Sequence, residues 1–238
     1  FFMIFVNGDS ITFGCELSND DLSYIKANRY THHISENFGE VKNISNKDYN
    51  NDRICKLSIE WLENNPKPDF AIIQWSPEKR FDWYDGKTWT TISPMAAASR
   101  NFYNNQKFQK LKPIPAAVAY YSEIDNIHMS QMKMWSNVHH LECYLEKREI
   151  PHYFWYGKGN PKKSKKLPDL NITYRNLSKW KDMYEMCDII GNKTEHPENY
   201  PSSASRIITN NWGSNNGVHP NENGHKIIAE HISDFIKW

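Results

Sequence analysis

The sequence carries almost no excess charge of either sign. Its 238 residues include 29 lysines and arginines against 28 aspartates and glutamates, which gives a formal net charge of +1. A chain so balanced produces no general field that would attract nucleic acid or an anionic membrane surface. The densest basic stretch, residues 158–166, is typical of a solvated loop, with an anion-contacting loop as the alternative. We therefore expect neither a nucleic-acid partner nor a membrane partner.

Cysteine is scarce, and the four that occur are scattered along the chain as Cys15, Cys55, Cys143 and Cys187. None belongs to a CxxC pair, so the pattern favours free thiols over a disulfide framework or a zinc site. The sequence also lacks an HExxH motif, and its two His-His pairs join neighbours that do not face one ligand on a helix. We therefore expect no metal and no other cofactor.

Long apolar runs are missing as well. No stretch of about 20 apolar residues, the length of a membrane-spanning helix, is present. The first ten residues, FFMIFVNGDS, run directly into an expected strand and do not resemble a signal peptide. The default expectation from these two observations is a cytoplasmic protein.

Aromatic side chains, in contrast, are abundant. They make up 14% of the chain, while hydrophobic residues account for 39% and charged residues for 24%. This balance is typical of a globular protein, and the length suits a single α/β domain covering residues 1–238. In so polar a chain, some of the aromatic rings are expected to line a surface or a cleft.

Short apolar segments alternate with amphipathic ones along the sequence. We expect strands at residues 2–7, 40–45, 69–75 and 151–156, and helices at 20–38, 51–63, 119–148 (as one helix or two), 177–186 and 221–236. The alternation predicts a three-layer α/β/α sandwich around a parallel sheet of the flavodoxin-like type. In the last helix the predicted apolar side contains Ile227, Ile228, His231, Ile232 and Phe235.

Residues 77–118 fit this alternation poorly. They are rich in aromatic residues and follow the carboxyl end of the clearest central strand, where open α/β sheets bind ligands. Two interpretations have equal weight here, an insertion or lid over a site and a satellite hydrophobic cluster.

Ser10 follows the first expected strand at once, in the segment VNGDSITFG, and glycines flank it as Gly8 and Gly14. This pattern indicates a sharp turn that places the serine hydroxyl at the carboxyl edge of the sheet. The backbone N–H of Ser10 would then lie at a helical turn, where it can receive an oxyanion. Taken alone, the triplet Gly-Asp-Ser is also compatible with an ordinary polar turn.

A second island, NGVHPNENGH, stands just before the last expected helix. His219 in this island can reach the same sheet edge and accept the serine proton. The combination of GDSxTxG near the start with xGxHPNxxGH near the end resembles blocks I and V of the SGNH, or GDSL-type, hydrolases. The order also differs from the common α/β-hydrolase plan, which uses a G-x-S-x-G motif and an acid between serine and histidine.

Two further islands strengthen the resemblance. The segment NNDRI begins at Asn50, and the segment IIQWS is followed by Arg80; both are similar to elements of a phage and bacterial subgroup of the family. The family's second block normally supplies a glycine N–H to the oxyanion hole and its third block an asparagine side chain. This chain has neither. The resemblance leaves as candidate oxyanion or substrate-binding groups Ser10, Tyr49, Asn50, Trp75, Ser76 and Arg80.

The family's acid position is occupied by Asn216. A carboxylate there would hold the imidazole in its useful tautomer and stabilise the imidazolium, whereas an amide is neutral. A Ser–His pair oriented by a backbone carbonyl remains a workable alternative, and the Asn216-Gly217 dipeptide is prone to deamidation to aspartate. Asp9 and Asp52 we interpret as hydrogen-bonding residues of turns rather than a catalytic pair.

The leading hypothesis is therefore an ester hydrolase with Ser10 as nucleophile, His219 as base and activity weakened by Asn216. The expected partner is a small-molecule or glycan ester, with deacetylation of a carbohydrate preferred because aromatic rings stack on sugars. A catalytically eroded SGNH-fold module that binds a glycan or a protein is the alternative from another class. Acyl transfer to a sugar or protein acceptor is a third possibility.

Overall fold

The computed structural model describes residues 2–15, 17–18, 21–47, 49–84, 86–87, 89–92, 118–125, 127–156 and 219–236. Four strands form one fully parallel sheet in the order β2 (Glu40–Asn43), β1 (Met3–Asn7), β3 (Phe70–Trp75) and β6 (His152–Tyr156). This order begins at a central strand and turns outward in both directions, as in flavodoxin-like sheets. Because all four strands are parallel, their carboxyl ends meet at one edge.

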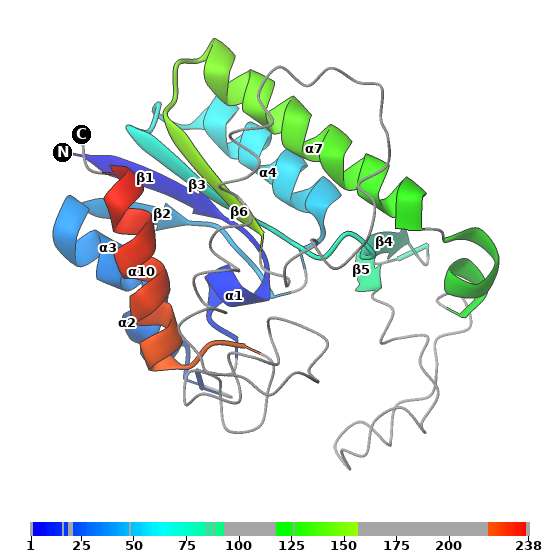
Figure 1. Ribbon diagram of the computed structural model, residues 1–238, viewed down its shortest axis with the longest axis horizontal. Coiled ribbons are helices and arrows are strands. Elements are labelled where there is room, and N and C mark those ends of the chain that lie inside the picture. Colours follow the sequence, from blue (N-terminus) through cyan, green and yellow to red (C-terminus); the bar gives the residue numbers. More distant parts are fainter. Residues whose placement is uncertain are drawn as a thin grey trace, which may run out of the picture.

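Helices cover both faces of this sheet (Figure 1). On one face lie α3 (Tyr30–Phe38) and α10 (Glu222–Ile236), and on the other α4 (Asn51–Asn64) and α7 (Ile127–Lys147). The strand residues alternate accordingly. In β3, Phe70 and Ile72 belong to the core on the α3/α10 side, whereas Ala71, Ile73 and Trp75 belong to the core on the α4/α7 side. The predicted three-layer α/β/α sandwich is confirmed.

The N-terminal helical stretch departs from the single helix predicted over residues 20–38. Two helices occur, α2 (Leu22–Asn28) and α3, with Arg29 between them in an extended conformation at φ −80° and ψ 154°. The Asp21 side chain caps α2, and the Tyr30 N–H at the start of α3 donates to His225 Nδ1 of α10 at 3.2 Å. The break therefore turns α3 towards α10, a tertiary contact that the local pattern does not contain.

The predicted apolar side of the last helix was also partly wrong. Its buried face includes His225, Ile228, Ala229, Ile232 and Ile236, while Phe235 is 40% exposed. These positions follow the spacing of one helix face, shifted by one residue from the predicted stripe.

The region after β3 begins with an antiparallel hairpin, β4 (Phe81–Tyr84) and β5 (Trp89–Ile92). Phe81 and Ile92 pack against Tyr120 and Tyr121 of the short π-helix η2 (Tyr120–Ile124), which precedes α7. The described part thus forms a satellite hydrophobic cluster. Residues 93–117, and with them most of the predicted lid, lie outside the described residues, as does the helix predicted at 177–186. No helix of the described residues has the length and apolar character needed to cross a membrane.

Candidate active site

Ser10 is the first residue of α1 (Ser10–Phe13), a one-turn helix that follows β1 at the carboxyl edge of the sheet (Figure 1). The close packing of this turn against β3 requires glycine at position 8. A Cβ atom there would stand 2.5 Å from Thr12 Oγ1 and 2.8 Å from the Cβ of Gln74, distances that real Cβ atoms do not adopt. Gly14 ends the helix at φ +91°, in the left-handed region that favours glycine. Glycine is therefore needed at position 8 for lack of space and at position 14 for its backbone conformation.

The start of α1 leaves one backbone donor available. A helix begins with N–H groups that have no partner within the helix. Here Gln74 Oε1 accepts the N–H groups of Asp9 and Thr12, both at 3.2 Å, and Asp9 Oδ1 accepts that of Ile11 at 3.2 Å. The Ser10 N–H alone has no acceptor among the described residues. Among the described residues, this group is therefore the donor of the turn that can bind an oxyanion beside the serine hydroxyl.

His219 lies directly before α10 and makes contact with the serine. Its Nε2 is 2.8 Å from Ser10 Oγ, although the two residues are 209 positions apart in the chain. When the hydroxyl donates to Nε2, the ring carries its own proton on Nδ1, which is the tautomer that a general base needs. The structure therefore brings together the two residues that the sequence singles out. Asn216 lies outside the described residues.

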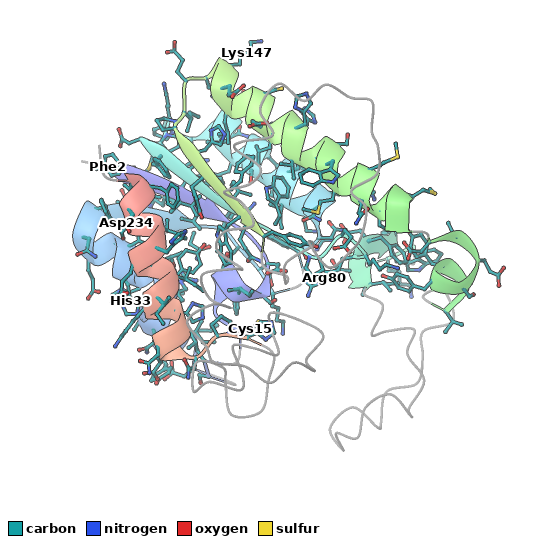
Figure 2. The ribbon with its side chains drawn as sticks, viewed as in Figure 1. Phe2, Cys15, His33, Arg80, Lys147 and Asp234 are labelled. Carbon is teal, nitrogen blue, oxygen red and sulfur yellow. The ribbon has the colours of Figure 1, made fainter. Side chains whose placement is uncertain are left out.

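A charged pair stands beside the nucleophile. Asp9, which is 2% exposed, is held through Oδ2 by Arg80 NH1 at 3.2 Å and through Oδ1 by Gln74 Nε2 at 2.6 Å. Asp9 Oδ1 is also 3.5 Å from Ser10 Oγ. Figure 2 shows Arg80 between α1 and the β4–β5 hairpin. Asp9 thus makes the hydrogen bonds of a helix-capping turn residue and forms an ion pair with Arg80.

The other candidate donors occupy two different places. Trp75 points to the opposite face of the sheet, where its ring packs edge-on against Phe154 in the α4/α7 core. Its indole Nε1 is buried and has no partner among the described residues. Ser76 follows it at the strand end, fully buried, with its backbone N–H and carbonyl both bonded to the side-chain amide of Asn51. Its hydroxyl has no partner among the described residues.

Asn50 is the N-cap residue of α4, at the same corner of the sheet. Its Oδ1 caps the helix by accepting the Arg53 N–H at 2.9 Å, and its Nδ2, fully buried, has no acceptor within the described part of the chain. The connection from β2 to α4 contacts the nucleophile turn, Gly8–Thr12, because the Asn46 N–H donates to the Gly8 carbonyl at 3.4 Å. Tyr49, beside it, lies under the Arg53 guanidinium, and burial raises the pKa of its phenol.

Four residues that the sequence analysis did not select as site residues complete the surroundings: Thr12, Tyr30, Gln74 and His225. Thr12 Oγ1 donates to Gln74 Oε1 at 2.8 Å and lies 3.1 Å from the Tyr30 hydroxyl. The backbone of Tyr30 bonds to His225, and all of these side chains are buried. Burial lowers the pKa of His225 to about 3, with smaller contributions from His33, His219 and Arg29. The one sequence feature that could have pointed to this network is Gln74, a polar residue within an otherwise apolar strand.

No group of three or more histidine, cysteine or acidic side chains suited to a metal ion occurs in the described part of the chain. The described residues at this corner offer a hydroxyl, an imidazole and N–H donors.

Comparison with known proteins adds solved structures only. No family model matches the chain, and a comparison with curated proteins also finds no match. Solved structures that align with it include a protein described as lipolytic and of the G-D-S-L family from Desulfitobacterium hafniense DCB-2, with 12% identity, 98% of each chain covered and a TM-score of 0.47. The psychrotrophic esterase EstA from Pseudoalteromonas sp. aligns with 11% identity over 98% of this chain and 96% of its own, at a TM-score of 0.46. The lipase Lip_vut3 from a goat rumen metagenome gives 13% identity, 99% and 97% coverage, and a TM-score of 0.44. With identities and TM-scores this low, function has to rest on the geometry of the site.

Proposed function

We propose that this protein is a serine hydrolase of the SGNH type that cleaves a carboxylic ester. The observation that carries the proposal is the 2.8 Å contact between Ser10 Oγ and His219 Nε2, at a turn where the Ser10 N–H has no acceptor among the described residues. A nucleophile, a base within hydrogen-bond reach and a free donor beside the hydroxyl are the minimum set for acyl transfer.

The reaction follows from these positions. Ser10 Oγ attacks the ester carbonyl while His219 Nε2 takes the hydroxyl proton, and the Ser10 N–H binds the oxygen that becomes negative. The Asn50 Nδ2, which has no acceptor among the described residues, is a further candidate donor at that corner. The imidazolium then protonates the leaving alcohol, and water, activated by the same ring, hydrolyses the acyl-enzyme.

Asn216 sets the expected strength of this site. In serine proteases, replacing the triad aspartate by asparagine lowers turnover by about 10⁴-fold. We expect Asn216 at the corresponding position to leave slow acyl transfer, with the tautomer of His219 set by something other than a carboxylate. Asn216→Asp is then a gain-of-function change.

The substrate we favour is an acyl ester, in particular an acetyl ester, on a carbohydrate. Trp83 and Tyr84, which are 45% and 49% exposed, stand on β4. This strand begins immediately after Arg80, the residue paired with Asp9. Exposed rings on a strand that starts beside the nucleophile suit stacking against a sugar. Acetate release from a panel of acetylated glycans checks this, with a small soluble ester as the comparison; Trp83→Ala should slow only the glycans.

The decisive test is intact-mass analysis after exposure to a fluorophosphonate, comparing the parent protein with Ser10→Ala and Asn216→Asp. We expect a single adduct on the parent, none on Ser10→Ala and faster formation on Asn216→Asp. If neither the parent nor Asn216→Asp forms the adduct, the hydrolase proposal fails. The neutral residue at position 216 would then favour a glycan- or protein-binding module built on the same fold.

A further inference from the structure

Gln74 is a polar residue at the centre of an apolar strand. It is fully buried in β3, between Ile73 and Trp75, and an unsatisfied amide at such a depth would be costly. Its two polar atoms are nevertheless fully used. Oε1 accepts from the N–H of Asp9 and from the N–H and hydroxyl of Thr12, and Nε2 donates to Asp9 Oδ1 and, at 3.3 Å, to the Trp75 carbonyl.

These bonds meet the nucleophile turn from both sides of Ser10. Residues 9 and 12 are fixed to a strand of the rigid sheet, and the serine between them receives no bond from Gln74. Removal of the Gln74 oxygen would leave the Thr12 and Asp9 N–H groups without their acceptor. The turn would then have several unbonded donors in place of one, and no fixed orientation for the Ser10 hydroxyl.

The Gln74 amide also controls a charge. The Asp9 carboxylate lies 3.5 Å from Ser10 Oγ, where a negative group opposes the alkoxide that forms on attack. Gln74 Nε2 binds one of its oxygens at 2.6 Å and Arg80 binds the other at 3.2 Å. Gln74 therefore shares Oδ1 with the serine hydroxyl and offsets part of the charge on that oxygen, while Arg80 pairs with Oδ2.

We propose that Gln74 is the positioning residue of the nucleophile. It holds the turn so that the Ser10 N–H is the turn's one backbone donor without an acceptor among the described residues, and its Nε2 binds Asp9 Oδ1, the carboxylate oxygen that lies 3.5 Å from Ser10 Oγ. This inference rests on the proposed hydrolase function for its kinetic consequences. The hydrogen bonds themselves are independent of that function and can be tested without it.

The first variant removes the amide and keeps its shape. Gln74→Met should lower the rate of fluorophosphonate labelling and the kcat for a small ester by about 100-fold, with KM within about threefold, since misplacing a reacting group by 1 Å costs about that factor. Ile73→Val is the matched control, because it trims the adjacent residue of the same strand on the opposite face of the sheet. An equal loss in Ile73→Val, or an unchanged labelling rate in Gln74→Met, overturns the proposal.

The second variant uses pH as a readout that a merely structural role would not move. In Gln74→Glu the introduced carboxyl, when protonated, can still accept from Thr12 and donate to Asp9, as the amide does. When ionised, it places a second negative charge against Asp9. The ratio of Gln74→Glu activity to parent activity should therefore fall at least tenfold as pH rises through the ionisation of the new carboxyl. A pH-independent ratio contradicts the role assigned to Nε2.

Amide hydrogen exchange separates this inference from the hydrolase proposal. Exchange at the Thr12 N–H should accelerate at least tenfold in Gln74→Met and remain near the parent rate in Ile73→Val. If the parent protein forms no fluorophosphonate adduct, the hydrolase function fails, and the exchange comparison still decides whether Gln74 holds the turn. Unchanged exchange at Thr12 overturns the inference even if the parent labels.

Discussion

The two ends of the candidate site are built in different ways. The nucleophile turn, Gly8–Thr12, is fixed by buried hydrogen bonds to the neighbouring strand β3 and to the β2–α4 corner. His219 instead precedes a helix from the far end of the sequence, and its position depends on how α10 docks. Local sequence and the neighbouring β3 and β2–α4 segments shape the first end, whereas the packing of a helix from the far end of the chain must place the second.

Tyr30 connects the two ends. Its hydroxyl lies 3.1 Å from Thr12 Oγ1 in α1, and its N–H donates to His225, six residues after the candidate base in α10. The Tyr30 and His225 rings also stack at a centroid distance of 6.2 Å. A single fully buried side chain on α3 thus relates the position of the nucleophile's helix to that of the histidine's helix.

The largest effect is expected from removing Ser10 or His219, because the two side chains act together in one step. We expect Ser10→Ala and His219→Ala each to lower kcat/KM for a small ester by about 10⁴-fold or more, and the double variant to lose no more than either single one, because the groups act as a unit. Ser122→Ala and His139→Ala, at exposed positions outside the site, are the matched controls. Additive losses in the double variant would show that the two residues do not share one step.

Gly8→Ala is the sharpest perturbation confined to the nucleophile end. The new Cβ overlaps Thr12 Oγ1 and the Gln74 side chain, so we expect about 1–3 kcal/mol of destabilisation and a fall in labelling rate of about 100-fold. Gly86→Ala provides the contrast: Gly86 has a φ of +93°, but a Cβ added there meets no described residue within 4 Å, so the substitution strains the hairpin without touching the turn. Urea unfolding and labelling kinetics should show a stability loss in both variants and a rate loss in Gly8→Ala alone.

The contrast between a locally built turn and a histidine placed by tertiary packing also explains which parts of the site the sequence could predict. Ser10 was placed correctly at the sheet edge because a strand, a glycine and a capping aspartate are consecutive in the chain. The proximity of His219 rested on its resemblance to a family motif, since no local pattern brings residue 219 to residue 10. Gln74 was missed as a partner because its role depends on the register of β3 against β1. The helix break at Arg29 was missed because both flanking segments have helical patterns, and only the contact with His225 distinguishes them.

The histidine end should show its own sensitivity to acid. Burial lowers the pKa of His225 to about 3, from an ordinary value of 6.5, and His33, His219 and Arg29 add to the shift. Below pH 6.5 the unfolded chain takes up a proton that the folded interior excludes. The neutral His225 therefore costs no unfolding free energy above about pH 6.5, and the free energy of unfolding declines as pH falls from there towards 3.

His225→Gln keeps an acceptor for Tyr30 and removes this titration. Relative to the variant, the parent should lose about 2 kcal/mol of unfolding free energy between pH 7 and pH 5, because each pH unit below 6.5 costs about 1.4 kcal/mol. Urea midpoints measured at several pH values check the difference, and carboxylates elsewhere contribute equally to both proteins. Parallel stability curves would mean that His225 does not resist protonation in the folded state.

The smallest effect is expected where the histidine end is exposed. The Tyr24 hydroxyl of α2 donates to Glu222 at the start of α10, and both groups face solvent. Exposed pairs of this kind contribute little to stability, so Tyr24→Phe should change the labelling rate by less than about twofold. The hydrogen bond should still be visible in the phenol titration, because bonding to the carboxylate raises the pKa of Tyr24. In Glu222→Gln that pKa should move down towards its ordinary value when followed by ultraviolet absorbance. A large rate loss in Tyr24→Phe would instead mean that the outer contact, and not the buried Tyr30–His225 contact, fixes α10 and with it His219.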